Sequence, residues 1–137
     1  KEPRCAYNGT SAAFDVAAVE TVEIHPGNDA VVPVGVRFSI PEDQPYYMQI
    51  HLRSSIGFKR GLQGFIGTVD AGYTGDFGVK VINTSKFPET IKKGEYFAQV
   101  VVHKKPVLTF EELNPKQWSD YEQTQQRGNG GFGSSGK

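Results

Sequence analysis

One candidate for acid–base chemistry is an aspartate in a glycine-rich turn. Asp70 lies between two predicted strands, in the run Gly67-Thr68-Val69-Asp70-Ala71-Gly72-Tyr73-Thr74-Gly75. An exposed carboxylate is ionised at neutral pH and can accept a proton from water. Asp and Gly are also the residues of ordinary turns, and this segment alone favours a structural hairpin over a catalytic base.

A second segment combines hydroxyl groups with local positive charge. The run Arg53-Ser54-Ser55-Ile56-Gly57-Phe58-Lys59-Arg60-Gly61 predicts a short helical turn with a serine cap and a glycine end. The free amides at the start of such a turn, together with the fork of Arg53, form an anion site. Taken by itself, the segment somewhat favours a solvated basic turn.

The polar, glycine-rich stretch 123–137 predicts a mobile C-terminal tail. A single aromatic residue, Phe132, stands among its glycines and serines. There it could cover a planar base while neighbouring amides and hydroxyls bind phosphates. A disordered tail or linker is the alternative, and composition alone does not decide between them.

An acid at the N-terminal end completes the set of candidate residues. Small residues lead to Asp15, which strand-forming residues flank, so a solvent-facing Asp in a strand is its plain interpretation. The histidines, at positions 25, 51 and 103, are scattered, and no cluster has the spacing of a metal site. A polyphosphate ligand would therefore have to bring any Mg²⁺.

Short strands must position these residues. The 137 residues suit one domain, and 16 Gly and 8 Pro favour turns over helices. Hydrophobic patterns predict strands within 31–40, 47–52, 79–82 and 96–102, which indicates a sandwich or barrel. Pro33 predicts an edge strand or a bulge. A second helix is expected after Thr109-Phe110-Glu111-Glu112, which has a capping-box spacing, and after Asn114-Pro115, where Pro fits the first helical position.

The charge balance excludes two broad classes of binder. Lys plus Arg and Asp plus Glu both number 15, so a general nucleic-acid or membrane binder is not expected. No apolar run approaches the length of a membrane span, about 20 residues. The single Cys5 cannot form an internal disulfide, so we expect the cytoplasm or another reducing compartment. Positive groups are local, at Arg53, Lys59, Arg60, Arg127 and Lys137.

The order and spacing of these segments resemble the trimeric deoxyuridine triphosphate nucleotidohydrolases (dUTPases), which carry five short motifs. The similar segments are Gly9–Val16, Arg53–Gly61, Gly67–Asn83, Lys93–Gln99 and Arg127–Ser134. The resemblance implies an all-β, jelly-roll-like fold with at most one or two short helices. It also implies a β domain over 1–122, a tail over 123–137 that closes the active site, and a homotrimer with sites between subunits.

The resemblance further implies hydrolysis of dUTP to dUMP and pyrophosphate. Asp70 would be the base that activates the attacking water, and Asp15 would touch the water shell of a Mg²⁺ ion. The remaining residues would bind substrate. Gly64, Gly67 and Val69 would read uracil through the backbone, Tyr73 would pack under deoxyribose, Phe132 would close over uracil, and Arg53, Ser54, Ser55, Gln99, Arg127, Gly133 and Ser134 would bind phosphates.

Several positions depart from the family pattern. Ala13, Gly72 and Thr74 replace a glycine, an acid and an arginine that are usual in the family, and Gly64 replaces a side-chain amide found in some members. Related dCTP deaminases have a catalytic Glu where Lys80 stands, which disfavours deamination. A dUTP-gated regulatory protein is the other alternative. Residues 104–126 would then contact a protein partner, although they could equally extend a subunit contact.

Overall fold

The structure is a computed structural model that describes residues 1–131, 133 and 136. The chain divides into two compact units, Lys1–Pro106 and Val107–Lys137, and each is described by itself. The first unit holds all the strands of the described residues, one α-helix and a short 3-10 helix, η1, at Tyr7–Gly9. The second holds one helix and the glycine-rich end of the chain.

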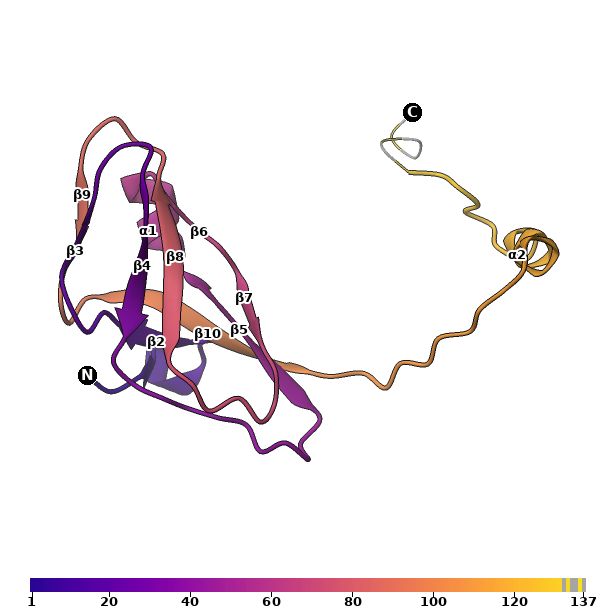
Figure 1. The fold of residues 1–137 in the computed structure, drawn as a ribbon, viewed down its shortest axis with the longest axis horizontal. Coiled ribbons are helices and arrows are strands. Elements are labelled where there is room, and N and C mark those ends of the chain that lie inside the picture. The colour runs from indigo at the N-terminus through magenta and orange to yellow at the C-terminus, as the bar shows by residue number, and fades with distance from the viewer. Residues whose placement is uncertain (132, 134–135, 137) are drawn as a thin grey trace. The chain divides into compact units, whose positions relative to one another are not determined.

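Antiparallel sheets build the first unit (Figure 1). One sheet has five strands in the order β1-β2-β10-β5-β7, a second has three in the order β4-β8-β6, and β3 pairs with β9. This arrangement confirms the expected all-β, jelly-roll-like class with two short helices. The strands are β1 Arg4–Cys5, β2 Phe14–Ala17, β3 Val22–Ile24, β4 Asp29–Val34, β5 Tyr46–Leu52, β6 Leu62–Gly64, β7 Gly67–Val69, β8 Phe77–Asn83, β9 Glu89–Ile91 and β10 Tyr96–Lys104.

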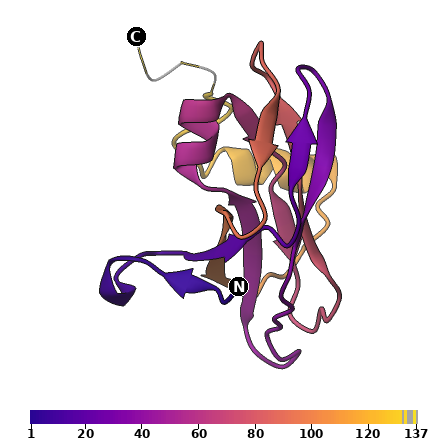
Figure 2. The ribbon, with the colours of Figure 1, turned by 90° about the vertical axis from the view of Figure 1, so that its left-hand side faces the viewer.

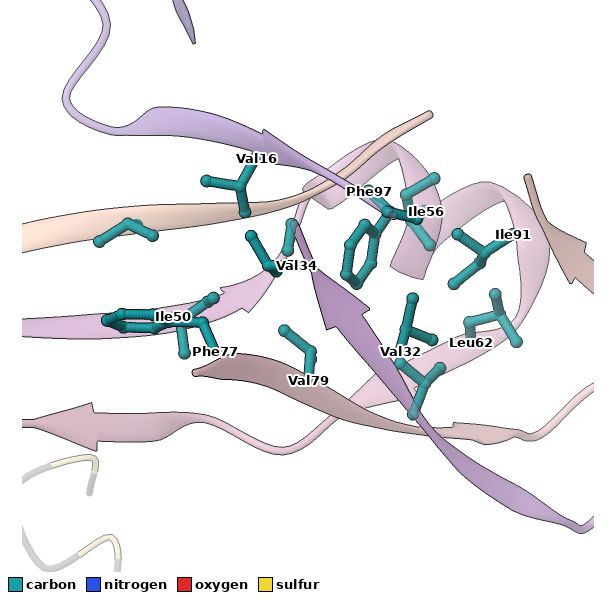
Figure 3. Packing of buried hydrophobic residues seen from close by; sticks show 14 of the residues in the cluster. Val16, Val32, Val34, Ile50, Ile56, Leu62, Phe77, Val79, Ile91 and Phe97 are labelled. Carbon is teal, nitrogen blue, oxygen red and sulfur yellow. The ribbon is translucent and has the colours of Figure 1, made fainter. Parts of the chain in front are cut away.

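One apolar core lies between the sheets (Figure 3). Alternate residues of β8, among them Phe77, Val79 and Val81, are buried, as the two-residue period of a half-buried strand requires. Figure 3 shows Phe97 of β10 beside Ile56, which is the buried residue of the helix α1. Burying each such large side chain contributes about 1.5–3 kcal/mol to folding. The core therefore fixes α1 against the sheet that carries β10.

The helix α1, Ser54–Arg60, follows β5 directly and ends at Gly61. Gly61 has a φ of 64°, in the left-handed region that favours glycine, and an added Cβ would lie 2.9 Å from Cβ of Ser85. The expected helix and its glycine end are thus confirmed. The expected serine cap is wrong, because Arg53 occupies the N-cap position and Ser54 is the first helical residue.

The second helix, α2, spans Pro115–Glu122. Asn114 accepts a hydrogen bond from the Gln117 amide, and the Gln117 side chain accepts one from the Asn114 amide. This reciprocal capping confirms the helix expected after Asn114-Pro115. The capping box lies at Asn114 and Gln117 and not at Thr109–Glu112, because residues 105–114 have no regular structure.

The predicted strands are confirmed, with one shortened. The expected stretch 31–40 forms a strand only as far as Val34, and Phe38 beyond it packs against the core as an irregular segment. Pro33 lies in β4, which is an edge strand of its sheet, as a residue without an amide hydrogen requires. The carbonyl of Pro33 accepts a hydrogen bond from the Val19 amide at 3.1 Å.

Candidate active site

Asp70 leaves the sheet directly after β7. The short strand β7 pairs with β5, with Gly67 opposite Ile50 and Val69 opposite Met48, so its end is fixed in register. Asp70 is exposed, and its carbonyl accepts a hydrogen bond from the Tyr73 amide at 3.3 Å. The turn therefore projects the carboxylate into solvent, where it is free to contact a ligand.

A pocket of about 530 Å³ opens beside Asp70. Four of the predicted site residues, Gly67, Val69, Asp70 and Tyr73, line it together. Its other walls come from β5, β7, the start of β8 and the turn between β7 and β8, namely Ile50, Thr68, Phe77, Gly78 and Asp76. The pocket therefore places a flat aromatic ring, bare backbone and a carboxylate around one cavity.

Tyr73 is held in place by three neighbours. Its hydroxyl donates to the Asp76 carbonyl at 2.7 Å, and its ring meets Phe77 edge-on at a centroid distance of 5.6 Å. Gly75 lies against the ring, because an added Cβ would stand only 2.6 Å from Cζ of Tyr73. Phe77 is itself stacked on Phe38 at 4.1 Å. The tyrosine ring therefore rests on packed aromatic side chains.

The loop between β4 and β5 supports the same turn from outside. The Gly72 amide donates to the Ile40 carbonyl at 2.8 Å, and Arg37 pairs with Asp76 at 2.7 Å. The hydrogen bond from the Arg37 guanidinium, with its positive charge, lowers the pKa of the Asp76 carboxyl. The same pair raises the pKa of Arg37. An ion pair and a backbone hydrogen bond thus join two loops at the pocket.

A second pocket, of about 420 Å³, opens at the start of α1. Arg53, Ser54 and Gly64 line it, among other residues. Gly64 ends β6 at a tight approach, because an added Cβ would lie 2.7 Å from Cγ of Leu52. Ser55 is exposed on the first turn of α1 and is not among the lining residues of either pocket. The predicted phosphate and base residues thus divide between two pockets that share β5 as a wall.

A row of polar residues crosses four strands of the large sheet. Asp15 of β2 lies opposite both Arg4 and Gln99, and Gln99 lies opposite His51. Directly opposed residues of antiparallel strands place their side chains on the same face. The Gln99 Nε2 atom is 3.4 Å from His51 Nδ1. Two predicted residues, Asp15 and Gln99, are therefore neighbours although the sequence separates them widely.

The Asp15 carboxylate is buried, with 6% exposed surface, between two guanidinium groups. Its Oδ1 atom is 3.3 Å from Nε of Arg53, and its Oδ2 atom is 3.3 Å from Nε of Arg4. Arg53 also donates from Nη1 to the Tyr96 carbonyl at 3.1 Å. The plain sequence interpretation, a solvent-facing Asp15, is therefore wrong, because the arginines cover it.

Arg4 is a residue that sequence reasoning missed. Besides pairing with Asp15, its guanidinium lies 4.0 Å from the ring centroid of Tyr96. Only its charge, opposite to that of Asp15, could have pointed to it, and a charge without a known strand register selects no partner. Arg60, expected as a local positive group, instead pairs with Glu89 and Glu95.

The second unit carries the remaining predicted residues. Arg127 donates from Nε to the Gly130 carbonyl at 2.9 Å and closes a turn of the tail. Gly133 has a φ of 90°, which favours glycine. Phe132 and Ser134 lie outside the described residues.

No group of three or more His, Cys, Asp or Glu side chains could hold a metal ion within the part of the chain that the structure describes. A direct metal site built from protein ligands alone therefore has no donor set here. The Asp15 carboxylate, which a Mg²⁺ ion bound to a polyphosphate would approach through its waters, is already paired with Arg4 and Arg53. Neither described helix is long and apolar enough to span a membrane.

Comparisons with known proteins agree on one family. The dUTPase family model matches residues 4–136. The deoxyuridine 5'-triphosphate nucleotidohydrolase of Nautilia profundicola is 39% identical over 96% of this chain and 89% of its own length. That of Clostridium tetani is 34% identical over 100% of this chain and 90% of its own length.

Solved structures agree as well. The dUTPase of Staphylococcus bacteriophage 80alpha with dUPNHPP has a TM-score of 0.86 at 27% identity, over 100% of this chain and 92% of that chain. A mutant dUTPase from phage phi11 of S. aureus, described with a coordinated structural Mg(II) ion, has a TM-score of 0.75 at 24% identity. It covers 82% of this chain and 89% of that chain, and at this identity the likeness concerns the fold.

Proposed function

The chain belongs to the dUTPase family, and from this premise we propose that Asp70 is the base with which it hydrolyses dUTP to dUMP and pyrophosphate. One observation carries the assignment of the base. Asp70 is the exposed carboxylate that shares a pocket with Tyr73 and with the bare backbone at Gly67. The other carboxylate of that pocket, Asp76, is paired with Arg37.

The proposed reaction is a single displacement at phosphorus. Asp70 takes a proton from a water molecule, and the water oxygen forms a bond to the α-phosphorus. The bond between the α-phosphorus and the bridging oxygen breaks, and pyrophosphate leaves with the electron pair. The proton stays on Asp70 until it is lost to solvent. Positioning and charge stabilisation provide most of the catalysis in such a transfer.

Groups at the start of α1 are proposed to bind the phosphates. Arg53 offers a planar fork of donors, Ser54 and Ser55 offer hydroxyls, and the first amides of the helix lack helical partners. Asp15 keeps the Arg53 side chain aimed, because its Oδ1 atom is 3.3 Å from Arg53 Nε. Gln99 belongs to the same polar row and is proposed to complete this group. From the tail, Arg127, Gly133 and Ser134 are proposed to add further donors.

The base and the sugar are proposed to bind at the β7 end of the site. The carbonyl and amide groups of Gly64, Gly67 and Val69 offer both donors and acceptors to the edge of uracil. Tyr73 is proposed to pack under the deoxyribose and to leave no room for a 2′-hydroxyl, since its ring is fixed by Asp76 and Phe77. Phe132 is proposed to close over the base.

Mg²⁺ is proposed to arrive with the triphosphate. Asp15 would hold its water shell, and the ion would neutralise phosphate charge. The proposal is supported by the family of the chain and by the place of the Asp15 carboxylate beside Arg53, which is proposed to bind the phosphates. Because two guanidiniums already cover Asp15, we expect contact only through water.

A homotrimer is proposed from the family resemblance. The residues proposed to bind substrate are divided between the two compact units, which suits a tail that serves a neighbouring subunit. Sedimentation should then report three times the chain mass of 15.1 kDa. A monomer mass would overturn the trimer without affecting the proposed base.

A nucleotide panel tests the function directly. The purified protein with Mg²⁺ should release pyrophosphate from dUTP much faster than from dTTP, dCTP or UTP. Equal turnover of all four nucleotides would overturn the specificity. The dCTP arm also tests deamination. Lys80 stands where the related deaminases have a catalytic carboxylate, and its side chain pairs with Asp29 at 3.9 Å. Formation of dUTP from dCTP would replace the proposed function with the deaminase alternative.

A further inference from the structure

The helix α1 is fastened at both of its ends to the start of β10. At its N-terminal end, the Arg53 amide donates to the Phe97 carbonyl at 2.9 Å, and the Arg53 side chain donates to the Tyr96 carbonyl. At its C-terminal end, Arg60 reaches Glu95, the residue just before β10. The start of β10 therefore determines where the helix lies. Figure 2 shows α1 at the same end of the first unit as β9.

The side chain of Arg60 makes three contacts that lie far away in the sequence. Its Nε atom donates to Oε2 of Glu89 at 3.1 Å, its Nη1 atom to Oε1 of Glu95, and its Nη2 atom to the Thr90 carbonyl. The Arg60 side chain keeps only 24% of its surface exposed. A guanidinium that binds two carboxylates and a carbonyl through separate nitrogens has one defined orientation.

The Glu95 carboxylate is itself anchored. Its Oε2 atom accepts the Lys92 amide at 3.0 Å, while the Glu95 amide donates to the Lys92 carbonyl at 2.9 Å. The Ala18 amide donates to the Glu95 carbonyl at 3.0 Å, which ties this turn to the end of β2. Arg60 therefore joins α1 to a turn that cannot easily move, rather than to a flexible side chain.

This pairing removes Arg60 from the set of phosphate ligands. Two carboxylates face one guanidinium, so the cluster carries no free positive charge for a phosphate. We propose that Arg60 is a positioning residue, which holds α1 so that Ser54 and Ser55 meet the phosphates of dUTP. The inference rests on the proposed function, because it assigns α1 the phosphate contacts.

The mechanism of positioning follows from the length of the helix. Ser54 and Arg60 are six residues apart, which corresponds to about 9 Å along an α-helix. The Arg53 contacts and the buried Ile56 hold the N-terminal half of α1, and a helix held only there could still turn about its own axis and carry the Ser54 and Ser55 hydroxyls with it. The attachment at Arg60 removes this freedom.

Steady-state kinetics and nucleoside binding test this role together. Arg60→Met should raise the KM for dUTP about tenfold and leave kcat within about twofold, because ground state and transition state share the phosphate contacts. Affinity for deoxyuridine, which has no phosphate, should stay within about twofold. Arg60→Lys keeps the positive charge but loses the planar fork of donors. Its KM should lie between that of Arg60→Met and that of the unsubstituted protein.

A second variant and a control complete the experiment. Glu95→Gln weakens the same attachment from the other side and should also raise the KM for dUTP. This variant keeps the inference testable if Arg60→Met does not fold. Asp29→Asn breaks the exposed pair with Lys80 and should leave the KM unchanged. An unchanged KM in the Arg60 and Glu95 variants would overturn the inference, as would an equal loss of deoxyuridine affinity. Failure of the unsubstituted protein to hydrolyse dUTP would instead overturn the proposed function.

Discussion

The side chain of Asp70 contacts no other side chain through a hydrogen bond or ion pair in the described residues, whereas most other acids near the site are paired. Asp70→Asn should therefore leave folding and dUTP binding intact and lower kcat by about 10²–10⁴-fold, the usual contribution of a general base. Single-turnover measurements with dUTP, alongside the Kd of a non-hydrolysable analogue, would check this expectation. Glu20→Gln, at an exposed acid in the loop between β2 and β3, is the control. Retained turnover in Asp70→Asn would exclude it as the base.

The pair of Arg37 and Asp76 makes a small part of the stability depend on pH. Because the pKa of Asp76 is lowered in the folded protein, the unfolded chain binds this proton more readily. The stabilisation is therefore present above the unfolded pKa of about 3.9 and is lost as pH falls through the folded pKa. In NMR titrations, Arg37→Met should raise the pKa of Asp76. Denaturation should show a small stability difference at pH 7 that vanishes in acid, and an equal difference at both pH values would contradict this.

Individual residues were predictable where local chemistry decides their place. Turn residues predicted that Asp70 lies in a hairpin turn between strands, and Gly61 marked the end of α1. The partners of Asp15 and Arg60 were not predictable, because those contacts depend on strand register and on residues up to 38 positions away. An exposed acid and a buried one look identical in a sequence.

At the scale of the elements, one side chain joins the end of β8 to β3 and to the loop that leads to β9. Asn83 at its end is fully buried, and its Nδ2 atom donates to the carbonyls of Ile24 in β3 and Phe87, both at 2.8 Å. Its Oδ1 atom accepts the amide and the hydroxyl of Ser85. The Asn83 side chain therefore provides hydrogen-bond partners for the loop that leads to β9.

Asn83→Ala should consequently destabilise the fold by about 2–4 kcal/mol, since it leaves several buried polar groups without partners. Chemical denaturation would measure the loss. Ser85→Ala removes only the hydroxyl contacts and should cost about 1 kcal/mol. Equal losses for the two substitutions would contradict the central role of the Asn83 carboxamide.

Strands differed in how clearly their sequences announced them. The alternation in β8 and the apolar runs of β5 and β10 extend over seven to nine residues and were predicted. The strands β3, β6, β7 and β9 have three residues each, too few for a period to be recognised. Their existence depends on the longer strands with which they pair.

At the scale of the whole molecule, the core and the tail are separate in the chain. Among the residues that the structure describes, every buried hydrophobic one lies between Val16 and Val100, and the second unit starts at Val107. The stability of the core should therefore depend little on residues 123–137, which are proposed to act as a lid. Deleting residues 127–137 should abolish dUTP turnover and shift the thermal midpoint by less than about 2 °C. Retained turnover would contradict the lid, and a large drop in the midpoint would show that the tail stabilises the fold.

The strand β5 stands behind both pockets, since Ile50 lines the pocket beside Asp70 whereas His51, Leu52 and Arg53 line the one at the start of α1. Successive residues of a strand advance by about 3.3 Å. The strand β5 therefore determines the distance between the site proposed for the base and the site proposed for the phosphates. The register with β10, in which Ile50 lies opposite Val100, fixes the position of β5. A two-residue insertion in β5 would keep each following side chain on its own face of the sheet and lengthen the ligand that fits by about 6.6 Å.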